Sequence, residues 1–327
     1  MKVSAFILLL CCALLQTSAL AWDAVGHRLT AAIALNELSP EKQEALRELL
    51  TQHPRYQLDF LEAMPSSVRM TNPSEQLQWL LGEAAYWPDI ARRLPEADAR
   101  RFNHPPWHYI DGSWARDAAT TQGNIYVLQQ PAAAEAGEPA SSIRNESDVQ
   151  NVVTALDYNT RVLADITRSM EERAVALCWV LHLMGDIHQP LHAGSLFSPN
   201  LFENGDRGGN AIDTDDGNLH ARWDRALADS GVMTNLEMIQ RDRGDYIDAI
   251  NNSSADWSQW LAESRSVLLT EVYTDPMLAA IASADRQNTA LPEQALDAAY
   301  IQNMQQISRQ RLALAGFRIA IWLENTL

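Results

Sequence analysis

A short apolar segment in the middle of the chain contains three histidines and one aspartate. His182 and Asp186 are four residues apart, so a helix would place both side chains on one face. An imidazole and a carboxylate arranged in this way can bind one divalent cation, and His192 is close enough to serve a neighbouring ion. A second pair with the same spacing, His220 and Asp224, follows downstream. Together the two pairs predict a hydrolase that uses several zinc ions.

Helical periodicity dominates the elements that must position these ligands. Apolar residues recur at helical spacing over residues 24–38, 40–50, 148–170 and 296–323, and Asp148 is the expected N-cap of the third segment. A nearly continuous apolar run at 173–184 is expected to lie at the centre of the domain. These segments predict a fold built mainly from helices.

Strand signals are few, and the best short candidate is 124–128. Two stretches, 131–147 and 194–218, have the composition of loops. The second of these connects the two metal-binding pairs, so it is expected to border the active site. Because the chain has no internal repeat and no long linker, the sequence predicts one all-α domain.

The first 21 residues have the pattern of a secretion signal. Lys2 supplies the positive charge, residues 6–15 are apolar, and Ala19-Leu20-Ala21 is a small-x-small cleavage site. We expect cleavage after Ala21, which leaves residues 22–327 as a periplasmic or secreted protein. No later segment has the length of a membrane span, and nothing in the sequence indicates an obligate protein partner.

The chain is strongly acidic, with a formal net charge of −17. Such a surface argues against tight, non-specific binding of duplex nucleic acid, which depends on many Lys and Arg contacts to phosphates. It does not exclude an enzyme that acts on nucleic acid, because bound zinc reverses the local field.

Further candidate ligands lie in three N-terminal motifs, which are Trp22 to His27, Tyr86-Trp87-Pro88-Asp89 before Arg92, and Trp107-His108-Tyr109-Ile110-Asp111. With the two helical pairs, these motifs resemble the S1/P1 nuclease family, zinc enzymes that share a fold with bacterial zinc phospholipase C. The resemblance covers the whole mature chain in order. It implies a single, mainly helical domain of the phospholipase C/P1 nuclease type over residues 22–327.

The resemblance also implies three zinc ions and their ligands. The first zinc would be held by Asp89, His108 and His182, with Asp186 bridging to the second. The second would also take His27 and the free α-amine and carbonyl of Trp22. The third would be held by His192, His220 and Asp224. In the family mechanism a hydroxide shared by two metals attacks phosphorus, with Asp89, Asp186 and Arg92 as catalytic residues.

The same resemblance implies the substrate. Tyr109 matches an aromatic that stacks on a base, Asp111 a residue that hydrogen-bonds the base edge, and Asn210 an asparagine of the same pocket; Arg92 would neutralise the phosphate. The expected activity is hydrolysis of single-stranded DNA and RNA to 5′-phosphate products, with 3′-nucleotidase activity on nucleotides.

Several alternatives stay open at this point. The enzyme could be a zinc phospholipase C acting on phospholipids, or the chain could be a zinc-storage protein without catalysis. Asp89 could cap a helix and Tyr109 could be a core residue. His188 lies in the central motif but matches no ligand position, so it is expected to support the ligands rather than bind a metal.

Overall fold

The structure is a computed structural model that describes residues 22–110, 124–129, 143, 145–247, 250 and 256–327. The predicted secretion signal and Asp111 lie outside the described residues. Within them, the all-α class is confirmed. The helices are α1 (Ala24–Glu37), α2 (Pro40–Leu50), α3 (Ser66–Arg69), α4 (Pro73–Ala91), α5 (Glu96–Phe102), α6 (Val152–Ala164), α7 (Met170–Asp186), α8 (Leu219–Asp224), α9 (Gly231–Arg241), α11 (Trp257–Val267), α12 (Asp275–Gln287) and α13 (Ala298–Thr326).

Short 3₁₀- and π-helical segments complete the described helical elements. The 3₁₀ segments are η2 (Pro105–His108), η5 (Glu146–Asp148), η6 (Pro190–His192) and η7 (Arg243–Tyr246), and the π segments are η1 (Tyr56–Leu61) and η8 (Leu268–Val272). Two of them, η2 and η6, each end on a predicted metal ligand. Both begin with proline, whose fixed φ suits the first turn of a helix.

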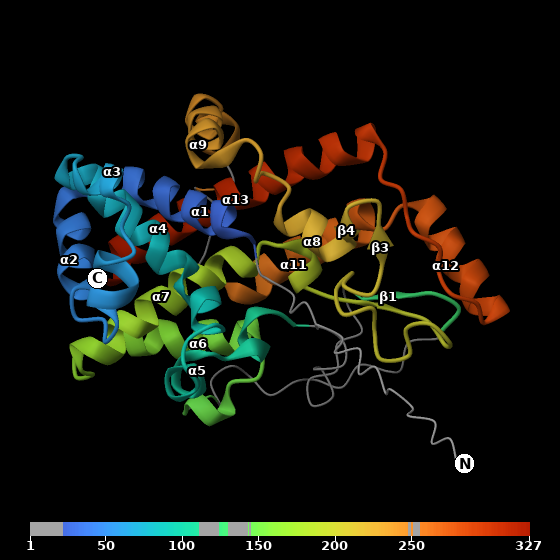
Figure 1. Ribbon diagram of the computed structural model, residues 1–327, viewed down its shortest axis with the longest axis horizontal. Helices are drawn as coiled ribbons and strands as arrows, with labels where there is room; N and C mark the ends of the chain where they lie inside the picture. The colour runs from blue at the N-terminus through green and yellow to red at the C-terminus, as the bar shows by residue number, and fades with distance from the viewer. Residues whose placement is uncertain (1–21, 111–123, 130–142, 144, 248–249, 251–255) are drawn as a thin grey trace, which may run out of the picture.

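The centre of the molecule is a bundle in which α1 packs against α4, α7 and α13 (Figure 1). Helix α7 is buried along most of its length from Ala174 to Asp186 because its sequence is apolar on nearly every side. The predicted central position of the apolar run is therefore confirmed. Helices α8 and α12 and the short strands lie on the opposite side of this bundle from α2 and α3 (Figure 1).

The predicted helix over residues 148–170 is wrong in its bounds. Asn151, not Asp148, caps α6, because its side chain accepts hydrogen bonds from the backbone N–H groups of Val153 and Thr154. Asp148 instead belongs to η5, where it accepts from the backbone N–H of Asn145. Helix α6 stops at Ala164, and α7 begins after a new cap at Ser169 that forms a capping box with Glu172.

The strands are only two residues long. β1 (Ile125–Tyr126) pairs in parallel with β2 (Leu196–Phe197), and β3 (Asp213–Thr214) forms a hairpin with β4 (Gly217–Asn218). The weak strand prediction at 124–128 is confirmed by β1. The predicted loop at 194–218 is irregular over most of its length, but β2, β3 and β4 fall within it. Strands of two residues are too short to produce an alternating pattern.

No helix in the described part of the chain combines the length and the apolar character that crossing a membrane requires.

Candidate metal centre

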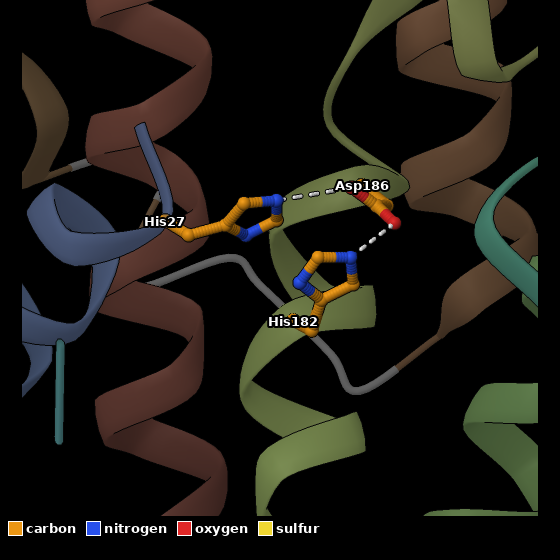
Figure 2. A group of neighbouring side chains, drawn as sticks. All are labelled: His27, His182 and Asp186. Carbon is orange, nitrogen blue, oxygen red and sulfur yellow. Dashed lines mark ion pairs between the residues drawn. The ribbon is translucent and has the colours of Figure 1, made fainter. Parts of the chain in front are cut away.

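The Asp186 carboxylate is the centre of the site. It lies at the end of α7, one turn after His182, and the His182 Nε2 atom is 3.1 Å from Asp186 Oδ2. His27 comes from α1 and places its Nε2 atom 3.5 Å from Asp186 Oδ1 (Figure 2). The two imidazole rings are stacked, with centroids 3.8 Å apart. The carboxylate therefore lies between ring nitrogens from two helices.

Two further imidazoles approach Asp186 from the short turns. The Nδ1 atom of His108, at the end of η2, is 3.1 Å from Asp186 Oδ2, and Nδ1 of His192, at the end of η6, is 3.7 Å from Asp186 Oδ1. Including His27 and His182, residues from α1, η2, α7 and η6 meet at one buried carboxylate. All of them are predicted ligands.

Backbone carbonyls orient three of the ligand histidines. The Nδ1–H groups of His182, His192 and His220 donate to the carbonyl oxygens of Ala85, His108 and Gly208, over 2.8, 2.7 and 2.6 Å respectively. A carbonyl can only accept, so the proton is on Nδ1 and the Nε2 lone pair is left for another partner. This is the arrangement that histidine ligands of metals usually have.

The ligand atoms gather into three groups, in each of which all atoms lie within 4.8 Å of one another. The groups are His27, His182 and Asp186; Asp89, His108 and His182; and His192, His220 and Asp224. They contain every side chain predicted as a ligand, and all are buried. The second and third groups match the predicted sets, while His182 is shared between the first and the second.

Several buried polar atoms of these residues lack hydrogen-bond partners in the described part of the chain. They are both ring nitrogens of His27, both carboxylate oxygens of Asp89, Nε2 of His108 and Oδ1 of Asp186. Leaving a buried polar group unsatisfied costs about 1–3 kcal/mol, so such a concentration needs an explanation. Nitrogen and carboxylate donors converging in this way fit divalent metal ions.

The protonation of the site also suits metal binding. Burial lowers the pKa of His27 and of His108 well below the usual value, so both are neutral at pH 7. Burial raises the pKa of Asp186, but the neighbouring histidines, His182 foremost, outweigh it and hold that pKa well below its usual range. Neutral His27 and His108 and an ionised Asp186 are in the forms that bind metal cations. Burial lowers the pKa of His182, but Asp186 outweighs it and raises that pKa, so a metal at His182 would compete with a proton.

The other two carboxylates behave differently. Burial raises the pKa of Asp89 and raises that of Asp224 well above its usual value. Arg92 partly offsets this at Asp89, because its Nη2 atom is 3.1 Å from Asp89 Oδ1. A cation bound by Asp89 or Asp224 would displace a proton, so metal binding is expected to weaken as the pH falls.

Trp22 lies against the same centre. Its indole Nε1–H donates to the carbonyl of Gly185 over 3.0 Å, and its side chain is 1% exposed. The next residue, Asp23, donates its backbone N–H to the carbonyl of Asp224 over 3.2 Å and caps α1 with its side chain. The main chain at Trp22 is therefore held close to Gly185, which precedes Asp186, and close to Asp224.

Gly185 leaves room for His27. A Cβ atom at this position would lie 3.1 Å from His27 Nδ1 and 3.3 Å from His27 Cε1, and the stacked His182 ring limits how far His27 can move. We expect Gly185→Ala to keep the helical circular-dichroism spectrum while weakening metal affinity by about tenfold, the scale seen when a ligand's support is disturbed. Isothermal titration with zinc measures this. An unchanged affinity would show that His27 adjusts freely.

A cavity of about 210 Å³ opens beside the metal groups. Its lining includes Arg92, Tyr109, Asn210, Arg207 and His220. The first three are the predicted substrate residues that the structure describes, and it brings them together in the lining of this one cavity. The position of Asp111 is outside the described residues.

Three residues near the ligands or the cavity were not predicted, or were predicted only to support the ligands. Gln189 donates its side-chain amide to Asp224 Oδ1 over 2.8 Å. His188 is in none of the metal groups of the described residues; its Nδ1 bonds Met184 O and its Nε2 accepts from Arg318 Nη1, both over 2.7 Å. Arg207 lines the cavity together with Asn210 and was not among the predicted site residues. Only its place in the polar loop could have indicated it.

Comparison with known proteins finds similarity to nucleases. A family model described as S1/P1 Nuclease matches residues 22–327. The chain is 24% identical over 318 residues to Endonuclease 2 of Arabidopsis thaliana, covering 93% of this chain and 90% of that protein. It is 27% identical over 267 residues to Nuclease S1 of Aspergillus oryzae, covering 75% and 78% of the two chains.

Proposed function

Because the chain belongs to the S1/P1 nuclease family, we propose that it is a zinc-dependent phosphodiesterase acting on single-stranded DNA and RNA. Its products would carry 5′-phosphates, and it would also remove the 3′-phosphate of mononucleotides. The observation that carries this proposal is the Asp186 carboxylate among four imidazoles, beside a cavity that contains Arg92 and Tyr109.

Three zinc ions are the proposed cofactors. His27 and Asp186, with the main chain of Trp22, would hold one; Asp89, His108 and His182, with Asp186 bridging, would hold the next; and His192, His220 and Asp224 would hold the third. Imidazole and carboxylate ligands suit zinc. When bound, zinc would make water a nucleophile near neutral pH and stabilise negative charge on the phosphate.

The protein groups have separate tasks in this proposal. Asp186 would keep the ligand histidines in place and join two metal sites. Asp89 would fix both a metal and the guanidinium of Arg92, which is 3.1 Å away. Arg92 lines the cavity with a side chain that is 13% exposed, so it can reach a phosphate there. A guanidinium binds phosphate oxygens through two parallel hydrogen bonds, which would orient the bond to be broken.

Tyr109 would select unpaired bases. It is partly buried, follows the ligand His108 directly and lines the cavity. Stacking on an aromatic ring is worth about 1–3 kcal/mol per base and accepts any base, whereas a duplex keeps its bases stacked internally. We expect Tyr109→Ala to lower kcat/KM on single-stranded DNA by about 10- to 100-fold. Tyr109→Phe is the matched control and should retain most activity, since the ring remains; equal losses in both variants would argue against stacking.

The proposal includes export. Residues 1–21 would be removed as a secretion signal, so that the mature enzyme begins at Trp22 in the periplasm or outside the cell. Processing would then create the free α-amine that the zinc site uses.

The direct test of the function is a comparison of substrates. Zinc-loaded protein is incubated with single-stranded DNA, single-stranded RNA, duplex DNA, 3′-AMP and phosphatidylcholine vesicles. We expect turnover of the single strands and 3′-AMP, little on the duplex, and none on the vesicles. Hydrolysis of phosphatidylcholine without nucleolysis would instead assign the site to phospholipids.

A further inference from the structure

Arg207 is a second cation at the cavity. It is exposed and lines the same cavity as Arg92 and Tyr109. Within the described part of the chain, no carboxylate forms an ion pair with it. In a protein with a formal net charge of −17, an exposed, unpaired arginine in the lining of a cavity provides local attraction for an anion.

The backbone holds Arg207 in an uncommon conformation. Its φ is +60°, in the left-handed region that residues other than glycine rarely adopt, and the flanking Gly205, Gly208 and Gly209 also have positive φ. Asp206 fixes the loop from below, because its buried carboxylate accepts hydrogen bonds from Leu196 N, Gly209 N and the Tyr273 hydroxyl over 2.9, 3.0 and 2.6 Å. Strained residues that are held so firmly are often functional.

The same loop is tied to the third metal group. The carbonyl of Gly208 accepts from His220 Nδ1 over 2.6 Å, and its N–H donates to Ser195 Oγ over 3.1 Å. There is no space for a side chain at Gly208, since a Cβ atom would lie 2.3 Å from the carbonyl oxygen of Leu191. Arg207 is therefore held at a fixed position relative to His220, which lines the same cavity.

We propose that Arg207 binds a phosphate of the nucleic-acid strand other than the one that is hydrolysed, so that the enzyme favours oligonucleotides over mononucleotides. This inference rests on the proposed nuclease function. Arg92 forms an ion pair with Asp89, a proposed metal ligand, and would serve the reacting phosphate, whereas Arg207 forms no ion pair with Asp89. A strand crossing the cavity would present a neighbouring phosphate to the free guanidinium, which can bind it with two hydrogen bonds.

The test compares Arg207→Asn with the wild type. Asparagine removes the charge but tolerates positive φ, so the loop should keep its shape. We expect kcat/KM on a single-stranded oligonucleotide to fall about tenfold, while kcat/KM on 3′-AMP, whose only phosphate is the one removed, stays unchanged. The slope of log kcat/KM against log salt on the oligonucleotide should become shallower by about 0.7, the value for one phosphate contact to a single strand.

Two variants control for charge and folding. Arg207→Lys keeps the cation and should lose less than Arg207→Asn, and Arg241→Asn removes an exposed charge on α9 and should have no effect. Equal losses on oligonucleotide and 3′-AMP, or no loss on either, would overturn the proposal for Arg207 while leaving the nuclease function intact. If the wild type cleaves no single-stranded substrate, the proposed function fails, and the role of Arg207 fails with it.

Discussion

Asp186→Asn is expected to lower kcat on single-stranded DNA by at least about 10³-fold, more than the 10–100-fold typical of losing a residue that only supports a ligand. The carboxylate is fully buried and lies 3.1–3.7 Å from ring nitrogens of four histidines. An amide is neutral and offers one oxygen, so it cannot join two metal sites. Metal analysis should show a fall from about three bound zinc ions per chain towards one.

The matched control is Asp285→Asn. Asp285 is also buried, but its carboxylate accepts hydrogen bonds from the loop at Asn200 and Leu201 and belongs to none of the metal groups of the described residues. We expect that variant to lose stability and to keep its zinc and its activity per folded molecule. Wild-type activity in Asp186→Asn would remove this residue from the catalytic centre.

An alanine added before Trp22 is expected to reduce activity by about 10²-fold or more, the scale for losing one electrostatic stabiliser of a transition state. The α-amine has a reference pKa of about 8 and can bind zinc only when it is free and neutral. In the extended chain this nitrogen is an amide. The structure holds Trp22 in place through its indole bond to Gly185 O, so the main chain cannot easily move away.

The control for this prediction is an alanine added after Leu327, which lengthens the chain equally and should have no effect. Intact mass spectrometry establishes where each preparation begins, and so also tests cleavage after Ala21. We expect the N-terminally extended protein to bind one zinc ion fewer. Equal activity and equal zinc content in both extended proteins would show that the α-amine is not a ligand.

Much of the site could be predicted because its ligands follow local rules. His182 and Asp186, and likewise His220 and Asp224, are one helical turn apart, and the structure gives 3.1 and 3.3 Å between their side-chain atoms. Helices α1 and α2 were predicted nearly to the residue from their apolar periodicity, and the structure adds their caps, Asp23 and Ser39.

Other features depend on tertiary contacts and leave no local pattern. The bounds of α6 were wrong because Asn151 outcompetes Asp148 as a cap, and both are good capping residues. The hydrogen bond from Gln189 to Asp224 connects residues that are far apart in sequence. The position of Arg207 depends on the hydrogen bond from the Tyr273 hydroxyl to the buried Asp206, which forms only in the folded chain.

The measurement that tests the central claim most directly follows zinc content and hydrolysis of single-stranded DNA together, in the protein that begins at Trp22. The protein is stripped with a chelator and then titrated with zinc. We predict no activity without metal, recovery that is complete at about three zinc ions per chain, and products with 5′-phosphates, since the structure forms three groups of ligands. Full activity in the stripped protein, or no cleavage by the fully loaded protein, would contradict the account.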